Sequence, residues 1–125
     1  MSLGVNTLTI DSRDPSRLAR FWAEALSWHV LVEHDSEALV APARSREEAP
    51  QAIAVLFVKN DAPKTGKNRF HFDLVPDDRD AEVRRLEAMG ATRADIGQGD
   101  VSWVVMRDPE GNEFCVLRSY EGDQR

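Results

Sequence analysis

The sequence predicts an α+β fold of two tandem βαβββ modules, whose mixed sheets curl around a central small-molecule cavity. An alternating strand, an Asp-led turn and an amphipathic helix occur near the N-terminus and again about 64 positions later. Three short segments of strand character follow each copy. In both leading strands polar and apolar residues alternate, so each strand presents one polar face, and the two polar faces are expected to converge on one pocket.

The first copy begins with a strand over residues 5–11, followed by a helix. Asp14 is a suitable N-cap, and Pro15 suits the first helical position, where a missing N–H costs nothing. Strands are then expected over 28–33, 37–41 and 52–59, with a long hairpin loop over 42–51. The apolar stripe of the helix, which repeats every three or four residues, consists of Leu18, Phe21, Trp22, Ala25 and Leu26.

The second copy begins with a strand over residues 70–75, and a helix is expected over about 80–89. Gly90 stands where a glycine ends a helix. Strands follow over 92–96, 101–107 and 113–118, and residues 108–111 (DPEG) match a type I turn. When the copies are aligned, Thr7 falls on His71, Thr9 on Asp73 and Asp14 on Asp78.

The length of 125 residues predicts a single domain, 1–125, containing both modules. We expect module one over about 4–60, a polar linker over about 60–68 and module two over about 69–120.

Charge and cysteine content exclude several classes of partner. The net charge of −6 and the pI near 5.0 argue against a nucleic-acid or anionic-membrane surface. The only basic cluster, residues 64–69, is interpreted as a solvated loop rather than a binding patch. A single cysteine, Cys115, excludes an internal disulfide, and the chain is expected to be cytoplasmic.

Two stretches carry a resemblance to a known family: KNRFHFDLVPDDRDAEVRRLEAMGAT at 67–92 and WVVMRDPEGNEFCVL at 103–117. Together with DSRDPSRLARFWAEALSWHV at 11–30, they resemble the glyoxalase-like domain family. That family belongs to the vicinal oxygen chelate superfamily of glyoxalases, bleomycin-resistance proteins and extradiol dioxygenases. The resemblance implies two βαβββ modules around a cavity that holds a small-molecule ligand. Relatives frequently pair, so a homodimer is compatible with it.

The resemblance also implies where metal ligands would stand: His on the first strand, Glu on the fourth, His on the fifth and Glu on the eighth. His71 occupies the fifth-strand position, but Thr7 and Cys115 replace the first-strand His and the eighth-strand Glu. The fourth strand is apolar on both faces. No metal and no other cofactor is therefore expected, because zinc sites normally use at least three protein ligands and magnesium or manganese sites prefer carboxylates.

His71 and Asp73, two residues apart on one strand, should point to the same face. They are the candidate catalytic pair, with His71 as a general base and Asp73 as its neighbouring carboxylate. The alternative is that they form an internal hydrogen-bond network at the base of the cavity. The candidate substrate-binding residues are Thr7, Thr9, Trp103 and Cys115.

Two functions follow from this pattern. The first is a glyoxalase-like lyase or isomerase that acts on a small oxygenated metabolite without the superfamily's usual metal site. The second is a binding protein of the bleomycin-resistance type, which sequesters a drug or metabolite unchanged. Whether the chain is an enzyme is left open, because both functions need the same cavity.

Overall fold

A computed structural model describes residues 2–119 and divides the chain into two compact units, Met1–Pro63 and Lys64–Arg125. The division falls inside the polar segment 60–68. The expected end of module two, at residue 120, lies outside the described residues. Within the described residues no helix is long and apolar enough to cross a membrane. We describe each unit, hereafter the first and the second module, by itself.

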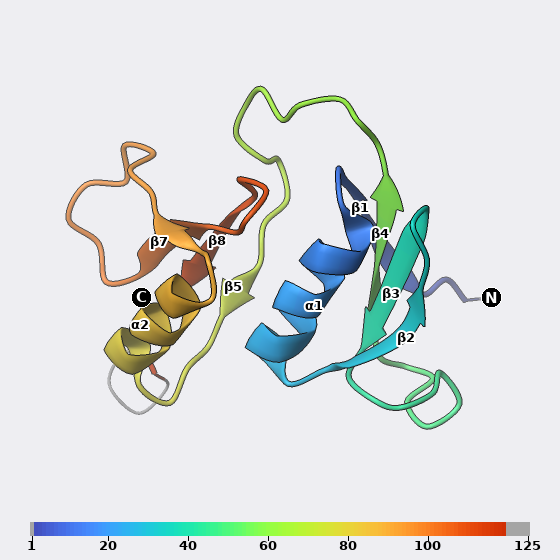
Figure 1. Cartoon of the computed structure of the whole chain (residues 1–125). Coiled ribbons are helices and arrows are strands. Elements are labelled where there is room, and N and C mark those ends of the chain that lie inside the picture. The colour runs from blue at the N-terminus through green and yellow to red at the C-terminus, as the bar shows by residue number, and fades with distance from the viewer. Residues whose placement is uncertain (1, 120–125) are drawn as a thin grey trace. The chain divides into compact units, whose positions relative to one another are not determined.

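The first module is a four-stranded mixed sheet with one helix against it (Figure 1). Its elements are β1 (Thr7–Ser12), α1 (Pro15–Leu26), β2 (His29–Glu33), β3 (Glu37–Ala41) and β4 (Ala54–Lys59). The strand order is β1-β4-β3-β2. β1 pairs with β4 in parallel, and the other two pairings are antiparallel.

The sequence sets both ends of α1. The Asp14 side chain accepts a hydrogen bond from the Arg17 N–H at 3.2 Å, and Pro15 opens the helix as predicted. Ser27 ends it in the left-handed conformation, with φ 58°. In the apolar stripe of α1, Leu18, Phe21 and Trp22 are buried and the last two residues are half-buried. The prediction that Trp22 is a core residue is confirmed by its exposed fraction of 2%.

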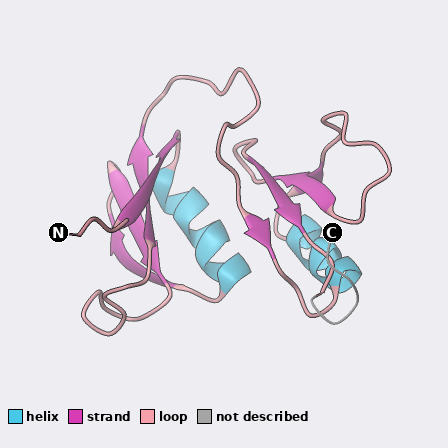
Figure 2. Cartoon of the chain, turned by 180° about the vertical axis from the view of Figure 1, so that it is seen from behind, coloured by secondary structure: helices cyan, strands magenta, loops and turns pink. Residues whose placement is uncertain are grey.

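The second module repeats this architecture with shorter strands (Figure 2). Its elements are β5 (Asp73–Leu74), α2 (Arg79–Ala88), β6 (Thr92–Arg93), β7 (Val104–Arg107) and β8 (Glu113–Val116). The strand order is β5-β8-β7-β6, with β5 and β8 parallel and the remaining pairings antiparallel. The fold prediction of two tandem modules of mixed sheets is confirmed; the cavity between them stays a prediction.

Local signals in the second module also act as predicted. Asp78 caps α2 by accepting a hydrogen bond from the Ala81 N–H at 3.1 Å. Gly90 follows the helix with φ 114°, a conformation that costs glycine little. In the 108–111 turn, the Gly111 N–H donates to the Asp108 carbonyl at 2.9 Å.

The predicted strands of the second module are shorter than expected: β7 and β8 begin or end two or three residues inside the predicted 101–107 and 113–118, and β5 and β6 keep two residues each. β6 stops at Arg93, although residues 92–96 were expected to form one strand. The Ala94 N–H still donates to the Val105 carbonyl, but side chains accept the N–H groups of residues 96 and 97. The Ile96 N–H donates to Gln98 and the Gly97 N–H donates to Asp95, and Gly97 has φ 85°. β5 keeps only two residues of the expected 70–75, although the Cys115 N–H still donates to the carbonyl of Phe72 at 2.9 Å.

The two faces of the second sheet differ in chemistry. One face is apolar: Met106, Phe114 and Val116 are buried, as are Val83 and Leu86 of α2, which contacts β6 and β8. Residues alternate along each strand, so the opposite face carries Asp73, Val105, Arg107, Glu113 and Cys115. This second group, defined here as the polar face, positions the candidate site.

Candidate functional site

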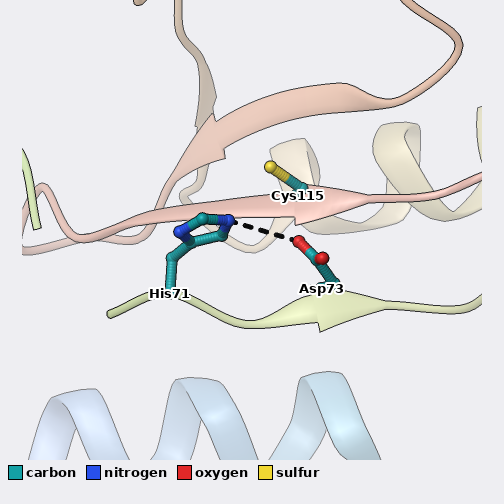
Figure 3. Close-up of side chains that lie close together, drawn as sticks. All are labelled: His71, Asp73 and Cys115. Carbon is teal, nitrogen blue, oxygen red and sulfur yellow. Dashed lines mark ion pairs between the residues drawn. The ribbon is translucent and has the colours of Figure 1, made fainter. Parts of the chain in front are cut away.

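Three side chains with polar or sulfur atoms meet on the polar face: His71, Asp73 and Cys115 (Figure 3). Asp73 pairs with Cys115 across the parallel β5–β8 ladder, and His71 lies two residues before Asp73. One nitrogen, oxygen or sulfur atom from each residue lies within 4.8 Å of those of the other two. The sequence prediction that His71 and Asp73 share a face agrees with this geometry, and the parallel pairing with β8 adds Cys115 to the pair.

The His71–Asp73 contact is direct, since His71 Nε2 lies 3.3 Å from Asp73 Oδ1. Both side chains reach solvent, with exposed fractions of 34% for His71 and 42% for Asp73. A ligand can therefore reach the imidazole ring without any part of the core moving. When Nε2 carries the proton and donates to Asp73, the lone pair of His71 lies on Nδ1.

Cys115 behaves differently from its two neighbours because its side chain is buried, with 6% exposed. Burial raises the pKa of the Cys115 thiol, and the charge of Asp73 and a hydrogen bond to Asp73 raise it further, against the opposing charge of Lys67. Cys115 is thus a neutral thiol near pH 7. A nucleophilic role, which needs the thiolate, does not suit this environment.

Trp103 lies beside this group. It packs, with Ala94, against a small apolar cluster formed by Val105, Cys115 and Leu117. The packing gives Trp103 a structural role, and its predicted stacking on a planar ligand stays a prediction.

Thr7 and Thr9 lie on β1 of the first module, where they pair with Ala54 and Leu56 of β4. Thr9 is exposed, and the Thr7 hydroxyl accepts a hydrogen bond from the Asn6 side chain at 2.6 Å. Their predicted contact with a ligand stays a prediction.

The donor set of His71, Asp73 and Cys115 suits zinc in type, because imidazole nitrogen, carboxylate oxygen and thiolate sulfur are all zinc ligands. It does not suit magnesium or manganese, which need several oxygen donors. Zinc binding would require Cys115 to lose its proton against a raised pKa.

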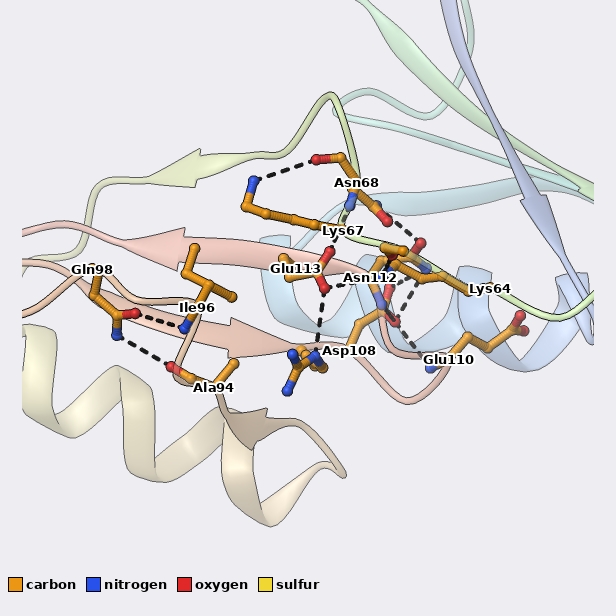
Figure 4. A network of polar contacts seen from close by, with 12 residues as sticks. Lys64, Lys67, Asn68, Ala94, Ile96, Gln98, Asp108, Glu110, Asn112 and Glu113 are labelled. Carbon is orange, nitrogen blue, oxygen red and sulfur yellow. Dashed lines mark hydrogen bonds and ion pairs between the residues drawn. The ribbon is translucent and has the colours of Figure 1, made fainter.

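Sequence reasoning missed a second polar group on the same face, centred on Glu113. Its carboxylate is almost completely buried, with 4% of the side chain exposed, and accepts hydrogen bonds from Lys64 Nζ at 2.9 Å and the Asn68 N–H at 2.8 Å (Figure 4). Arg107 Nε lies 3.5 Å away. Residues 64–67 and 69 are exposed, as expected of a solvated loop, but the Lys64 ammonium group pairs with a buried carboxylate.

The electrostatics of Glu113 follow from these contacts. Burial alone would raise the pKa of its carboxyl group, but the hydrogen bonds from Asn68 and Lys64 outweigh burial and lower the pKa to about 2. Glu113 stays ionised at any ordinary pH and holds the 64–68 segment onto β8. A signal was present in the sequence: Glu113 lies two residues before Cys115, so both side chains share a face.

Comparisons with known proteins agree with this architecture. The profile of the glyoxalase-like domain family matches residues 7–117. A family enzyme of the glyoxalase/bleomycin resistance protein/dioxygenase type from Burkholderia phytofirmans is 15% identical, with a TM-score of 0.70 and coverage of 93% of this chain and 98% of that one. No curated protein matches the sequence.

Two further solved structures share the fold. The trypanothione-dependent glyoxalase I of Leishmania major is 17% identical, with a TM-score of 0.66, over 96% of this chain and 89% of that one. The fosfomycin resistance protein FosX of Mesorhizobium loti is 17% identical, with a TM-score of 0.64, over 93% and 91%. At these identities the likeness establishes the fold alone.

Proposed function

The chain belongs to the glyoxalase-like domain family, and on that premise we propose that it is a lyase or isomerase that acts on a small oxygenated metabolite. The observation that carries the proposal is the contact of 3.3 Å between His71 Nε2 and Asp73 Oδ1 on an accessible face of the second module. This pair is the arrangement that a general base needs: an imidazole whose orientation and positive charge are supported by a carboxylate.

In the proposed reaction, Asp73 holds the Nε2–H of His71 and leaves the Nδ1 lone pair for the substrate. Nδ1 removes a proton from the carbon next to a carbonyl group, and Asp73 stabilises the resulting imidazolium by its charge. The imidazolium then returns the proton to an adjacent atom, which completes an isomerisation. If a leaving group departs from the neighbouring carbon instead, the same proton transfer completes an elimination.

We further propose that the chain works without the superfamily's usual metal site. Thr7 and apolar β4 provide no metal ligand at two of the family's four positions, and the raised pKa of Cys115 disfavours the thiolate at a third. Any zinc ion would be held by His71, Asp73 and Cys115, where it would polarise a substrate carbonyl as a Lewis acid.

A second candidate function is ligand sequestration of the bleomycin-resistance type. The observation that favours it is the half-buried ring of Trp103, which packs on the buried cluster of Val105, Cys115 and Leu117 next to the polar pair. A few polar groups beside apolar and aromatic surface suffice to bind a small molecule without reacting with it.

The protein is further proposed to be cytoplasmic and to form a homodimer. Light scattering of the purified protein tests the oligomeric state.

Solvent-proton exchange tests the proposed chemistry. The protein is incubated in D₂O with a panel of small α-hydroxycarbonyl compounds, and deuterium incorporation and product formation are followed by ¹H NMR. Wild-type protein is expected to exchange the proton of at least one compound, and His71→Ala is expected to abolish exchange. His34→Ala is the matched control, because His34 is also exposed but lies between β2 and β3 of the first module. Exchange that survives in His71→Ala would remove His71 from the mechanism.

Elemental analysis tests the metal proposal separately. Wild-type protein purified without chelator is expected to contain no stoichiometric zinc, nickel or manganese. Thermal unfolding in each ion is expected to show stabilisation well below the roughly 2.7 kcal/mol that a ligand at one hundred times its Kd produces. Stoichiometric metal that disappears in Cys115→Ala would contradict the metal-free proposal.

A further inference from the structure

The second module contains a hollow of about 470 Å³ next to the candidate site. Its wall includes the 64–67 segment, the Asp95–Ile96 segment, the end of β7 at Arg107 and the start of β8 at Glu113. All of these residues belong to one compact unit. The hollow is therefore a feature of the second module alone.

Cations outnumber carboxylates in the lining, although the whole chain has a net charge of −6. The cations are Lys64, Lys67 and Arg107, and the carboxylates are Asp95 and Glu113. Asp95 also accepts the Gly97 N–H at 2.9 Å. The lining has a net charge of +1, opposite in sign to the charge of the whole chain, so the hollow favours anions over cations.

Glu113 forms a hydrogen-bonded ion pair with Lys64 and a longer ion pair with Arg107. Lys64 Nζ donates to the Glu113 carboxylate and to the Gly66 carbonyl. Arg107 reaches Glu113 through Nε alone, at 3.5 Å. Its two terminal amino groups have no partner among the described residues, so they can bind the two oxygens of one carboxylate or phosphate group.

Lys67 is the cation most available to a ligand. Its Nζ donates only to the neighbouring Asn68 carbonyl, at 3.3 Å, and forms no ion pair within residues 2–119 (Figure 4). The backbone N–H groups of Thr65, Gly66 and Lys67 likewise donate to no other described residue. One side of the hollow thus offers an ammonium group that is available to an anion.

The hollow and the candidate site lie on the same face of one sheet. Glu113 and Cys115 are two residues apart on β8, a separation of about 7 Å along the strand, and Arg107 pairs with Glu113 as Val105 pairs with Cys115. The charge of Lys67 also acts to lower the pKa of Cys115, against the larger effects of burial and of Asp73 that raise it. An anion held by Lys67 would have the remainder of its molecule within reach of His71.

We propose that this hollow is an anion-binding subsite, in which Lys67 and Arg107 hold a carboxylate or phosphate group of the small molecule that His71 and Asp73 act on. The proposal rests on the proposed small-molecule function and narrows its substrate class to anionic metabolites. The local charge of the subsite is opposite in sign to the net charge of the chain.

Titration of ¹⁵N-labelled protein with inorganic phosphate and, separately, with acetate tests the subsite. The amide signals of Gly66 and Lys67 are expected to shift along a saturable curve with at least one anion, and sodium chloride at equal ionic strength is expected to give no saturation. Binding of phosphate alone would assign a phosphorylated ligand, and binding of acetate alone would assign a carboxylate. Saturation by neither anion would overturn the proposal.

The variants give the second arm of the test. Lys67→Gln is expected to raise the Kd at least fivefold, whereas Lys59→Gln, which removes a lysine of the first module, is expected to leave it unchanged. Arg107→Gln should act like Lys67→Gln, but Lys67 is the primary variant because Arg107 also touches Glu113. Equal Kd values in wild type and Lys67→Gln would overturn the proposal.

His71→Ala separates the subsite from the catalytic function. This variant is expected to bind the anion with an unchanged Kd, because His71 does not line the hollow. Saturable binding without any solvent-proton exchange would retain the subsite and remove the catalytic proposal. Proton exchange without anion binding would retain the catalytic proposal and remove the subsite.

Discussion

The two modules share one topology but differ in the chemistry of their equivalent positions. In both, a leading strand pairs in parallel with the last strand of the module, and a capped helix follows the leading strand. Thr9 faces Leu56 in the first module where Asp73 faces Cys115 in the second. The side chains that pack on the helix are alike, because burial constrains them, while the opposite face is free to vary. Among the described residues, the one group of His, Cys and carboxylate side chains that meets within 4.8 Å, His71, Asp73 and Cys115, lies on that face of the second module.

Substitution of the equivalent residues Thr7 and His71 gives the largest expected effect. His71→Ala is expected to lower turnover by at least about 100-fold, the usual contribution of a general base. Thr7→Val removes one hydroxyl group and is expected to change turnover by less than about tenfold, the value of roughly one lost hydrogen bond. Steady-state kinetics on the compound identified by proton exchange gives both numbers. Equal losses would mean that the modules share the chemistry.

Glu113 provides the next test, since Ala54 stands at its place in the first-module ladder. Glu113→Gln removes the charge that Lys64, Asn68 and Arg107 surround, and is expected to lower the free energy of unfolding by about 2 kcal/mol. Urea denaturation measures the loss, and Glu47→Gln, at an exposed position of the first module, is the control. A change below about 0.5 kcal/mol would show that the network contributes no stability.

The same carboxylate predicts how stability depends on pH. Glu113 has a pKa of about 2 in the folded protein, against 4.5 for an ordinary glutamate, so the unfolded chain binds its proton first as the pH falls. Its contribution is complete above pH 4.5 and is lost between pH 4.5 and 2, and amounts to at most about 3 kcal/mol. Denaturation of wild type and Glu113→Gln across this range should show curves that converge at low pH. A constant difference would contradict the assignment.

Substitution of the two helix N-caps is expected to give the smallest losses of stability, and similar losses in both modules. Asp14→Ala and Asp78→Ala each remove a side-chain acceptor from a helix N-terminus, and each is expected to cost about 1 kcal/mol of stability. Urea denaturation with circular dichroism measures both. A large difference between the two losses would show that the N-cap contributes more to the free energy of unfolding in one module than in the other.

The sequence predicted features that depend on neighbouring residues. Asp14, Asp78, Gly90 and the 108–111 turn act within a few residues of themselves, so a single stretch of chain contains the whole signal. The pairing of His71 with Asp73 follows from strand alternation in the same way.

What the sequence did not predict depends on segments far apart in the chain. Glu113 accepts a hydrogen bond from Asn68, 45 positions away, and that contact exists only once β8 and the 64–68 segment lie side by side. Only the family resemblance predicted that Cys115 belongs to the same site as His71, because spacing within one strand does not determine the β5–β8 register that pairs Cys115 with Asp73. The early end of β6 depends on the side chains of Asp95 and Gln98, which compete with the strand ladder for backbone donors.

The position of the proton on the His71 ring tests the central claim most directly, since the account needs Asp73 to hold Nε2–H and leave the lone pair on Nδ1. Long-range ¹H–¹⁵N correlation of the imidazole, recorded at a pH where the ring is neutral, identifies the protonated nitrogen. We expect the proton on Nε2 in the wild type, and a mixture of the two neutral forms in Asp73→Asn. A wild-type proton on Nδ1, or a ring unaffected by Asp73→Asn, would contradict the proposed base.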